Sequence, residues 1–353
     1  MSRVAFYAPM KPPDHPTPSG DRQMARLLLD VSKRAGYAPE IASDLRVRDG
    51  TGDPVAQSRH LDAAENEIER IAARWGNDPP ALWFTYHCYY KAPDLIGPVL
   101  ADRFGIPYVI AEASRARKRL EGPWASFARF AEAAIDRADL LLAMTAHDRF
   151  ALDRDAKDGQ KIADFPPFLD PGNEPSLKMP RDSLRLLTVA MMRGEDKLAS
   201  YRALAETMRA LGGDWHLTII GDGPRRIDVE AMFEGFGDGV SFAGEVSDSA
   251  SLRKHYEAAD VFVWPGINEA YGMVYLEAQA AGTPVVAEDR PGPRAVIGAG
   301  SAIVPKGDAA AFRDGILRVA NAEAGVAARR YVVGVHGIEA AAARIGTLLG
   351  ELV

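Results

Sequence analysis

The sequence predicts two α/β domains, each built around a doubly wound parallel sheet. The chain has 353 residues, more than one ordinary hydrophobic core accommodates, which favours two domains of roughly 150 to 200 residues. Short apolar runs alternate with segments of helical periodicity along the whole chain, the pattern of repeated βα units. Hydrophobic residues make up 47% and charged residues 26%, so the composition is that of a folded globular protein.

The first domain is predicted to span residues 1–175. Its predicted strands are the apolar runs 4–8, 40–43, 81–86, 107–112 and 140–145. Helical segments at 20–35 and 61–75 lie between them, because their apolar residues recur at three- and four-residue spacing.

Residues 164–183 hold five prolines and few periodic apolar residues, so they are predicted to link the two domains. The second domain is predicted over 176–330, followed by a terminal helical segment, 331–353, that packs back on the first domain. Its predicted strands are 184–192, 216–221, 240–244, 261–265, 284–288 and 301–305, with helices near 197–211, 225–236, 249–258, 273–281 and 308–320. Two such domains are expected to face each other across a cleft at the carboxyl ends of their strands, where open α/β sheets bind ligands.

Composition excludes several classes of protein. The net charge of −7 argues against a nucleic-acid partner. The single cysteine, Cys88, excludes a disulfide framework and a thiolate metal cluster, which fits a reducing cytoplasm. The start, MSRVAFYAPM, is unlike a signal peptide, and no run reaches the roughly 18 apolar residues of a membrane span. Contact with a membrane is therefore expected only at its surface, if at all.

The stretch NEAYGMVYLEAQAAGTPVVA, residues 268–287, places two glutamates in apolar surroundings. Gly272 and Gly282 limit a short helix that is apolar nearly all round and therefore buried. Glu277 lies inside this helix, which offers its carboxylate no donor. Two kinds of partner could satisfy the Glu277 carboxylate. One is the diol of a ligand such as a ribose, and the other is an arginine of the protein such as Arg294, in an ion pair.

Glu269 precedes the same helix, in the loop that follows the strand 261–265. The amides of residues 270–274 form the positive end of the helix, which suits a phosphate or a sugar hydroxyl. One glutamate can thus face a sugar while the other holds a ribose.

The sequence EAYGMVYLEAQAAGTPVV resembles the signature of the retaining GT-B glycosyltransferases called family 4, of the glycogen synthase and mannosyltransferase type. GDGP (221–224), VSFAGEV (240–246) and YEAADVFVWPGINEAYG (256–272) follow the same family order. The resemblance covers the second domain well and the first mainly by topology, with weaker similarity at 19–36 and 105–112. It implies the GT-B fold: α/β, with two Rossmann-like domains facing each other across a cleft.

The resemblance assigns roles to named residues. Glu277 would bond the ribose of a nucleotide sugar, and Glu269 would contact the hydroxyls of the donor sugar. The loop FAGEV would lie near the base. The remaining donor-binding residues that the resemblance implies are Tyr271, Gly272, Met273, Val274 and Gly244.

Two cations of the family stabilise the leaving diphosphate, whose negative charge grows as the anomeric bond breaks. Lys197 aligns with the family lysine. Met191 stands where the family has arginine, and Arg193 lies two residues later. Lys197 and Arg193 are therefore candidates for this role. The alternative is that both are solvent-exposed residues at the start of a helix, without a role in binding.

The first domain supplies further candidates at carboxyl ends of its strands. Ser19 and Gly20 precede the first helix, and Gly20 would let a phosphate or sugar approach closely. His87 follows strand 81–86, and Glu112 ends strand 107–112, where family members often have histidine. Both are candidates for contacts with the acceptor or the donor sugar.

The implied function is transfer of a sugar from a UDP- or GDP-sugar to a hydroxyl of a carbohydrate or glycoconjugate acceptor, with retention and with no cofactor or required metal. Two alternatives remain: a sugar-nucleotide epimerase of similar fold, and a non-catalytic nucleotide-sugar-binding protein, which the methionine at 191 favours mildly. A nicotinamide dehydrogenase is disfavoured because Arg226 stands where the third glycine of G-x-G-x-x-G would be.

Three other features are predicted to be structural. The sequence DRD at 153–155 resembles a metal motif but lies in a polar helical run, so a solvated face is expected. The seven histidines have no metal-ligand spacing. The segment SRARKRLEGPW, 114–124, holds four cations before a tryptophan. It would touch an anionic lipid or an acidic acceptor, or form a solvated loop, and the solvated loop is the prediction.

Overall fold

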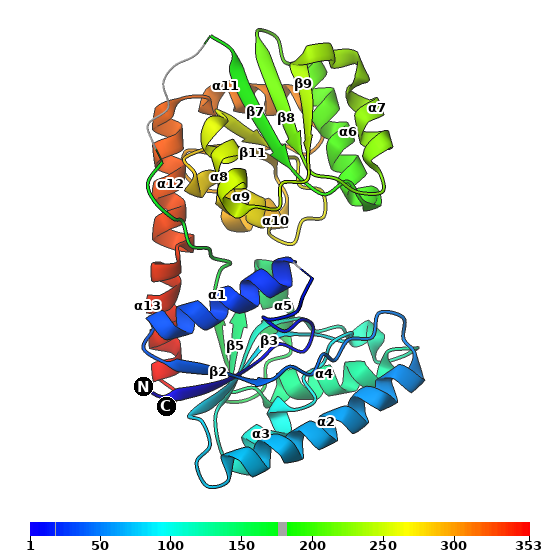
Figure 1. Ribbon diagram of the computed structural model, residues 1–353, viewed down its shortest axis with the longest axis vertical. Coiled ribbons are helices and arrows are strands. Elements are labelled where there is room, and N and C mark those ends of the chain that lie inside the picture. Colours follow the sequence, from blue (N-terminus) through cyan, green and yellow to red (C-terminus); the bar gives the residue numbers. More distant parts are fainter. Residues whose placement is uncertain (18, 176–181) are drawn as a thin grey trace. The chain divides into compact units, whose positions relative to one another are not determined.

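The computed structural model describes residues 1–17, 19–175 and 182–353 (Figure 1). The chain divides into two compact units, residues 1–166 with 339–353, and residues 167–338. The domain limits predicted from the sequence, after residues 175 and 330, remain a proposal beside these units.

The first unit contains a six-stranded sheet in the order β2-β1-β3-β4-β5-β6, with every pair parallel. Its strands are β1 (Arg3–Tyr7), β2 (Ala38–Ser43), β3 (Leu82–Cys88), β4 (Tyr108–Ala113), β5 (Leu140–Ala143) and β6 (Lys161–Asp164). The five strands predicted in this half are confirmed. The sequence analysis missed β6, an edge strand whose side chains are at most partly buried.

Helices cover both faces of this sheet. In Figure 1, α1 and α13 lie on one face and α2, α3 and α4 on the other. The helices of this unit are α1 (Gly20–Arg34), α2 (Pro54–Trp75), α3 (Gly97–Phe104), η1 (Arg117–Arg119), α4 (Ala125–Arg137), α5 (Ala146–Arg154) and α13 (Ile338–Gly350).

The second unit contains a six-stranded parallel sheet in the order β12-β11-β10-β7-β8-β9. Numbered within the unit and read from β9, this is the 3-2-1-4-5-6 order of a Rossmann fold. All six predicted strands are confirmed. Their bounds are β7 (Leu184–Val189), β8 (Trp215–Ile220), β9 (Val240–Gly244), β10 (Val261–Val263), β11 (Val285–Glu288) and β12 (Ala302–Val304).

The second sheet is also covered on both faces, with α11 packed against α6 and α12 packed against α9. The sequence analysis missed the six-residue α10. The helices are α6 (Gly194–Ala210), α7 (Arg226–Phe233), η2 (Glu234–Gly239), α8 (Ser249–Ala258), α9 (Met273–Ala280), α10 (Pro291–Val296), α11 (Ala309–Val319) and α12 (Ala322–His336).

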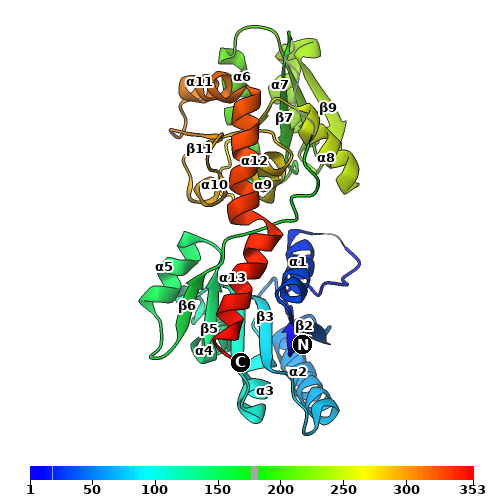
Figure 2. The ribbon, with the colours of Figure 1, turned by 90° about the vertical axis from the view of Figure 1, so that its left-hand side faces the viewer.

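The terminal segment, expected to be one helix, consists of α12 and α13, which are separated at Gly337. The backbone of Gly337 is extended, and a Cβ there would lie 2.4 Å from the Val333 carbonyl oxygen. Within the first unit, Arg34 pairs with Glu339 and Lys161 pairs with Glu351. Figure 2 shows α13 lying over the strands of that unit.

The sheet interiors explain why the strands were readable from sequence. Residues of β5 and β10 are buried on both faces, as in most central strands of both sheets. Parallel strands covered by helices on both sides form continuous apolar runs.

Each sheet also has one point where strand order reverses, between β1 and β3 in the first and between β7 and β10 in the second. At such a point the loops leave in opposite directions, and a crevice opens at the carboxyl ends.

Two glycines of α12 provide a test of the packing against α9. A Cβ on Gly325 would lie 2.4 Å from the backbone oxygen of Gly282, whereas a Cβ on Gly334 meets nothing within 4 Å. We expect Gly325→Ala to lower the free energy of unfolding by about 1–3 kcal/mol through overpacking. Gly334→Ala should raise it by up to about 1 kcal/mol through helix propensity. Urea denaturation followed by circular dichroism measures both, and equal effects would contradict the close approach.

Candidate functional site

The candidate site of the second unit begins at the reversal point between β7 and β10. Lys197 lies in the first turn of α6, just after β7, and its ammonium pairs with Oε1 of Glu269, in the loop after β10. The indole Nε1 of Trp264 donates to the same Oε1 at 2.9 Å. The Lys197 Nζ also lies 5.5 Å from the Trp264 ring centroid. Two residues predicted separately from the sequence are thus brought together.

The loop that carries Glu269 is tied to the start of α6. The Asn268 side-chain amide donates to Asp196 at 2.8 Å, and the Ile267 amide donates to the Ser200 hydroxyl at 3.0 Å. Asn268 has a left-handed backbone, with φ of 53°. Non-glycine residues in this conformation are strained and cluster at functional sites. The loop is therefore held in one shape by contacts to the neighbouring strand connection.

Gly272 ends this loop and begins α9. Its φ is 72°, and a Cβ would lie 2.7 Å from the Tyr275 ring, so only glycine fits. Among the described residues, no protein acceptor is found for the amides of Gly272, Met273 or Val274. These free donors at the start of a helix form a site for an anion. Tyr271, beside them, is half-buried against the core.

Glu277 lies one turn further along α9. Tyr256, on α8, donates its hydroxyl to Oε2 of Glu277 at 2.9 Å. No hydrogen bond to Oε1 is found within the described part of the chain. Arg294 pairs instead with Asp289 on the surface, so the hypothesis of an ion pair between Glu277 and Arg294 is wrong. Burial raises the pKa of the Glu277 carboxyl, and the Tyr256 hydrogen bond lowers it only in part.

The second predicted cation stands apart from this cluster. Arg193 is the N-cap residue of α6, is exposed, and forms no ion pair with any described residue. Met191, at the position of the family arginine, is 53% exposed. The structure brings Lys197 to Glu269 but leaves Arg193 free in solvent.

The glycine turn after β8 packs against the same strand connection. A Cβ on Gly221 would lie 1.9 Å from the Ala190 carbonyl oxygen, and one on Gly223 would lie 2.4 Å from that of Met192. Both glycines have positive φ. The GDGP sequence is therefore required by close backbone packing. Gly244, at the end of β9, has a φ of 70° and accepts a hydrogen bond from the Gly221 amide at 2.8 Å.

The first unit has a polar cluster at its own reversal point, between β1 and β3. Asp21, in the first turn of α1, lies 3.0 Å from Nδ1 of His87 on β3. Ser19 caps α1 by accepting from the Arg22 amide, and a Cβ on Gly20 would meet nothing within 4 Å. A ligand thus has room to approach Gly20 as predicted, but no neighbouring protein atom requires glycine at this position.

His87 and Glu112 share an unusual backbone. Their φ values are 63° and 58°, both left-handed. Burial disfavours the His87 imidazolium, but the charges of Glu112 and Asp21 outweigh it and raise the His87 pKa. Burial also raises the pKa of Glu112, against the effect of His87. Oε2 of Glu112 is buried and has no hydrogen-bond partner in the described structure. The two predicted residues therefore share a left-handed backbone, and the charge of each affects the pKa of the other.

Comparison with known proteins finds a family that the second unit resembles. Residues 184–322 match the model of a family described as "Glycosyl transferases group 1". This range contains Lys197, Glu269 and Glu277. This part of the chain is therefore similar to the group 1 glycosyltransferases.

Curated proteins similar to this chain are named as glycosyltransferases. A D-inositol 3-phosphate glycosyltransferase of Geodermatophilus obscurus is 30% identical over 245 residues, covering 59% of this chain and 52% of the relative. A phosphatidyl-myo-inositol mannosyltransferase of Mycobacterium leprae is 37% identical over 107 residues, covering 30% of this chain and 28% of the relative. The chain spans about half the length of the first curated relatives it matches.

Solved structures show the GT-B fold. Sucrose-phosphate synthase from Thermosynechococcus elongatus has a TM-score of 0.71 and 19% identity, covering 100% of this chain and 99% of that one. Anabaena Alr3699/HepE, solved in complex with UDP-glucose, has a TM-score of 0.67 and 15% identity, with both chains covered fully. The two Rossmann-like units of this chain and their similarity to these structures confirm the predicted fold class.

Two properties of the described residues bear on what this chain can bind. They contain no group of three or more histidine, cysteine, aspartate or glutamate side chains arranged to hold a metal ion. No described helix has the length and apolar character needed to cross a bilayer.

Sequence reasoning missed three residues of these clusters: Tyr256, Trp264 and Asp21. Tyr256 and Trp264 stood inside the motif that carried the family resemblance, but nothing local marks them as partners of a glutamate. Tyr256 contacts Glu277 only because α8 and α9 pack side by side. Asp21 directly follows the predicted residues Ser19 and Gly20. It could have been predicted as a site residue, because it is a polar residue in the first turn of a helix that follows a strand.

The raised pKa of the partly buried Glu277 predicts a measurable pH dependence of stability. Because its pKa is raised in the folded protein, ionisation costs more there than in the unfolded chain, and stability falls as pH rises from the ordinary glutamate pKa of about 4.3 to the raised value. Glu277→Gln removes this cost and keeps an acceptor for Tyr256. We expect its melting temperature to exceed that of the unmodified protein at pH 7 and to match it at pH 4.

Thermal scans of both proteins across this pH range test the prediction. Glu323→Gln, an exposed glutamate at the start of α12, controls for loss of one negative charge. A melting temperature of Glu277→Gln that is lower than the unmodified protein's at pH 7 would show that the carboxylate stabilises the unliganded fold.

Proposed function

We propose that this protein transfers a sugar from a nucleotide-diphosphate sugar to an acceptor hydroxyl, with retention of configuration. The observation that carries the proposal is the half-satisfied carboxylate of Glu277. One oxygen is held by Tyr256, while the other has no partner among the described residues, one turn from free helix amides. A vicinal diol beside a diphosphate matches that arrangement of one acceptor and several donors.

Glu277 and Tyr256 would together bind the ribose. The Tyr256 hydroxyl occupies Oε2, so the carboxylate is held in one orientation before the ligand arrives. A ribose hydroxyl donating to Oε1 would compensate the burial that raises the Glu277 pKa. Ligand binding would thereby favour the ionised form, which gives Glu277 a differential preference for a polyol.

The diphosphate would meet the amides of Gly272, Met273 and Val274, with Tyr271 beside them. Lys197 would supply positive charge against the leaving group, since its ammonium already lies in this loop cluster. Preorganised cations of this kind lower the barrier as negative charge grows on the departing phosphate. Arg193 is the second candidate, because nothing in the described protein neutralises it. With these cations, we propose that the reaction requires no metal.

Glu269 would bind hydroxyls of the donor sugar. Its Oε1 accepts from both Trp264 and Lys197, and no partner is found for Oε2 in the described residues. Glu269 therefore positions Lys197 and keeps one oxygen for a ligand. In a retaining reaction on one face of the sugar, the leaving phosphate oxygen would take the proton of the acceptor hydroxyl.

Names of related proteins support a nucleotide sugar without choosing the base. A relative from Mycolicibacterium smegmatis, 37% identical over 84 residues, is called a GDP-mannose-dependent alpha-mannosyltransferase. Anabaena Alr3699/HepE is solved with UDP-glucose. Both UDP- and GDP-sugars therefore remain in the proposal, with Gly244 and its loop near the base. His87 and Glu112 would serve the acceptor or the donor sugar, and the reducing cytoplasm would be the compartment, as Cys88 is unpaired.

We expect Glu277→Ala to reduce affinity for UDP- or GDP-sugars and kcat/KM at least 100-fold, because a buried polar interaction with the ribose is lost. Lys197→Met should lower kcat more than it raises KM, since the positive charge acts mainly on the transition state. Calorimetry with nucleotide diphosphates and their sugars measures binding, and product analysis with a panel of acceptors measures transfer. Glu323→Gln is the matched control and should be unaffected.

The same assays separate the competing functions. Conversion of the donor sugar to an epimer without any acceptor would identify an epimerase. Tight donor binding with no transfer to any acceptor would identify a binding protein. Unchanged kinetics in Glu277→Ala would overturn the assignment of the site.

A further inference from the structure

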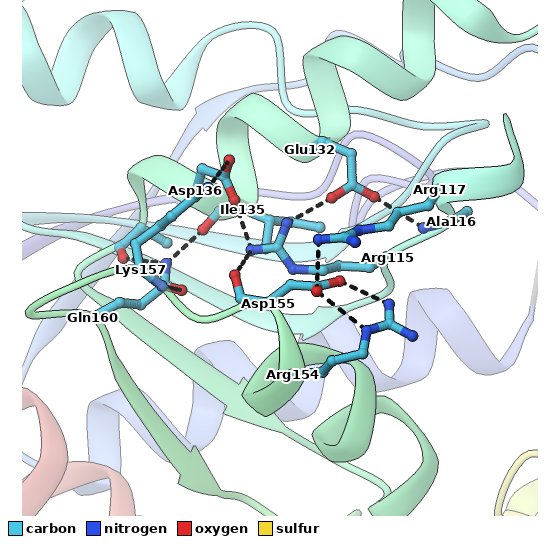
Figure 3. A network of polar contacts seen from close by, with 11 residues as sticks. Arg115, Ala116, Arg117, Glu132, Ile135, Asp136, Arg154, Asp155, Lys157 and Gln160 are labelled. Atoms are coloured by element: carbon cyan, nitrogen blue, oxygen red, sulfur yellow. Dashed lines mark hydrogen bonds and ion pairs between the residues drawn. The ribbon is translucent and has the colours of Figure 1, made fainter. Parts of the chain in front are cut away.

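The basic segment at 115–119 separates into two kinds of cation. Arg115 is enclosed, with its side chain 3% exposed, and it pairs with Glu132 at 2.6 Å and Asp136 at 2.7 Å. Arg117 pairs with Asp155 at 2.6 Å (Figure 3). The expectation of a plain solvated loop is therefore wrong for Arg115.

The expectation of a solvated DRD segment, 153–155, is also wrong in part. Asp153 is exposed and pairs with Arg149 on its own helix. Asp155 is 5% exposed and joins Arg117 and Arg154 in the network of Figure 3. This network neutralises the first half of the basic segment, so that half offers no charge to a partner.

Arg119 is the other kind of cation, together with Lys91 after β3. Neither has a carboxylate within ion-pair distance among the described residues, and Nε of Arg119 is buried without a hydrogen-bond partner. Both lie against the same two rings. The Arg119 guanidinium is 5.1 Å from the Tyr90 centroid and 5.2 Å from that of Trp124, and the Lys91 Nζ is 5.6 Å and 5.4 Å from them.

These four residues, Tyr90, Lys91, Arg119 and Trp124, form what we call the cationic platform. Its two rings meet edge to face, with centroids 5.7 Å apart. The chain around it is well anchored, since the Trp124 indole donates to the Asp49 carbonyl and the Asp49 amide donates to that of Lys91. The side chains of the platform are therefore held in place by the surrounding chain.

The platform is continuous with the polar cluster at the reversal point of the first sheet. Tyr89 connects them, because its ring lies 4.8 Å from that of His87 and 5.5 Å from that of Tyr90. The charge of Arg48 also acts on Tyr89, lowering its pKa against the larger, raising effect of burial. A row of rings thus leads from His87 to Lys91 and Arg119, neither of which forms an ion pair with a described residue.

Two positive charges beside one pair of rings repel each other, and each ring attracts a cation by only about 0.5–1 kcal/mol at an exposed site. A bound anion would relieve this repulsion and accept hydrogen bonds from the guanidinium of Arg119 and the ammonium of Lys91. The apolar faces of Tyr90 and Trp124 would pack against the C–H groups of a sugar ring. Cations and aromatic rings in one surface therefore fit a ligand that is both anionic and carbohydrate.

We propose that the cationic platform binds the acceptor, and that this acceptor is a six-membered-ring carbohydrate carrying a phosphate or carboxylate group. The proposal names the acceptor class of the proposed transferase and rests on that function for the acceptor's role. The anion would lie at Lys91 and Arg119. The ring would lie along Tyr90 and Tyr89, which brings its hydroxyls toward His87 and Glu112.

A membrane surface fits these residues less well. Electrostatic binding to lipid needs several exposed, uncompensated cations, each contributing about 1 kcal/mol. Two of the four cations in the segment are neutralised within the protein, and no large exposed apolar side chain lies at 114–124. A compact anion matches the paired Lys91 and Arg119 better than a bilayer does.

Calorimetric titration with glucose 6-phosphate, glucuronate, glucose and inorganic phosphate tests the platform without any donor. We expect the two anionic sugars to bind at least ten-fold more tightly than glucose or inorganic phosphate. Arg119→Gln and Lys91→Gln should each weaken this binding at least five-fold. Lys118→Gln removes the neighbouring exposed charge of the same segment and should leave it unchanged. Melting temperatures of all variants confirm that they are folded.

Several results would overturn the proposal. These are absence of binding by the anionic sugars, equal losses in Lys118→Gln and Arg119→Gln, and inorganic phosphate binding as tightly as glucose 6-phosphate. Sedimentation with vesicles of phosphatidylcholine and 20 mol% phosphatidylglycerol, without binding of free sugars, would assign the surface to lipid instead.

Titration of the same samples with UDP and GDP separates this proposal from the proposed function. Nucleotide binding that is lost in Glu277→Gln but kept in Arg119→Gln would support the donor site whatever the sugars do. Binding of anionic sugars without nucleotide binding would leave the platform standing and reject the transferase.

Discussion

The reversal of strand order in each parallel sheet is the constraint on which the candidate sites depend. Every strand of a parallel sheet ends at the same edge, so the loops that follow must leave there. Where two neighbouring strands send their connections in opposite directions, a crevice is left between the loops. Asp21 meets His87 at this point of the first sheet, and Lys197 meets Glu269 at this point of the second.

Polar groups at these edges are preorganised at some cost to the fold. Glu277 is partly buried, with one oxygen bonded by Tyr256 and no partner for the other among the described residues, and His87 and Glu112 adopt left-handed backbones. Each feature destabilises the unliganded protein, and each is compensated by the surrounding apolar sheet and helices. Features of this kind gather where a ligand is to be bound, because a fully satisfied protein group has little to offer a ligand. The cationic platform follows the same rule, with two cations that no carboxylate of the described residues neutralises.

The sequence allowed most of the sheet to be predicted and less of the connections. The inner strands β7, β8, β10 and β11 of the second unit were predicted because they bury residues and form apolar runs, whereas the edge strand β9 was predicted from its apolar run although its residues are at most partly buried. The edge strand β6 and the short α10 were missed because each buries too few residues to impose a pattern. The terminal helix was expected to be continuous, whereas packing at Gly337 divides it. Local periodicity cannot report such a break, since it depends on the Val333 carbonyl against which that glycine packs.

For the candidate site, the sequence by itself determined which residue types were present and at what spacing: two glutamates eight residues apart, a helix start rich in free amides, and a lysine after a strand. These are local properties of the chain. Only the tertiary structure decided their partners. In the folded chain Tyr256 donates a hydrogen bond to Glu277, Lys197 pairs with Glu269, and Arg294 pairs with Asp289 instead. The tertiary structure also enclosed Arg115 among carboxylates while leaving Arg119 over two rings. The physical reason is that charge compensation depends on distances between side chains far apart in sequence, and folding alone sets those distances.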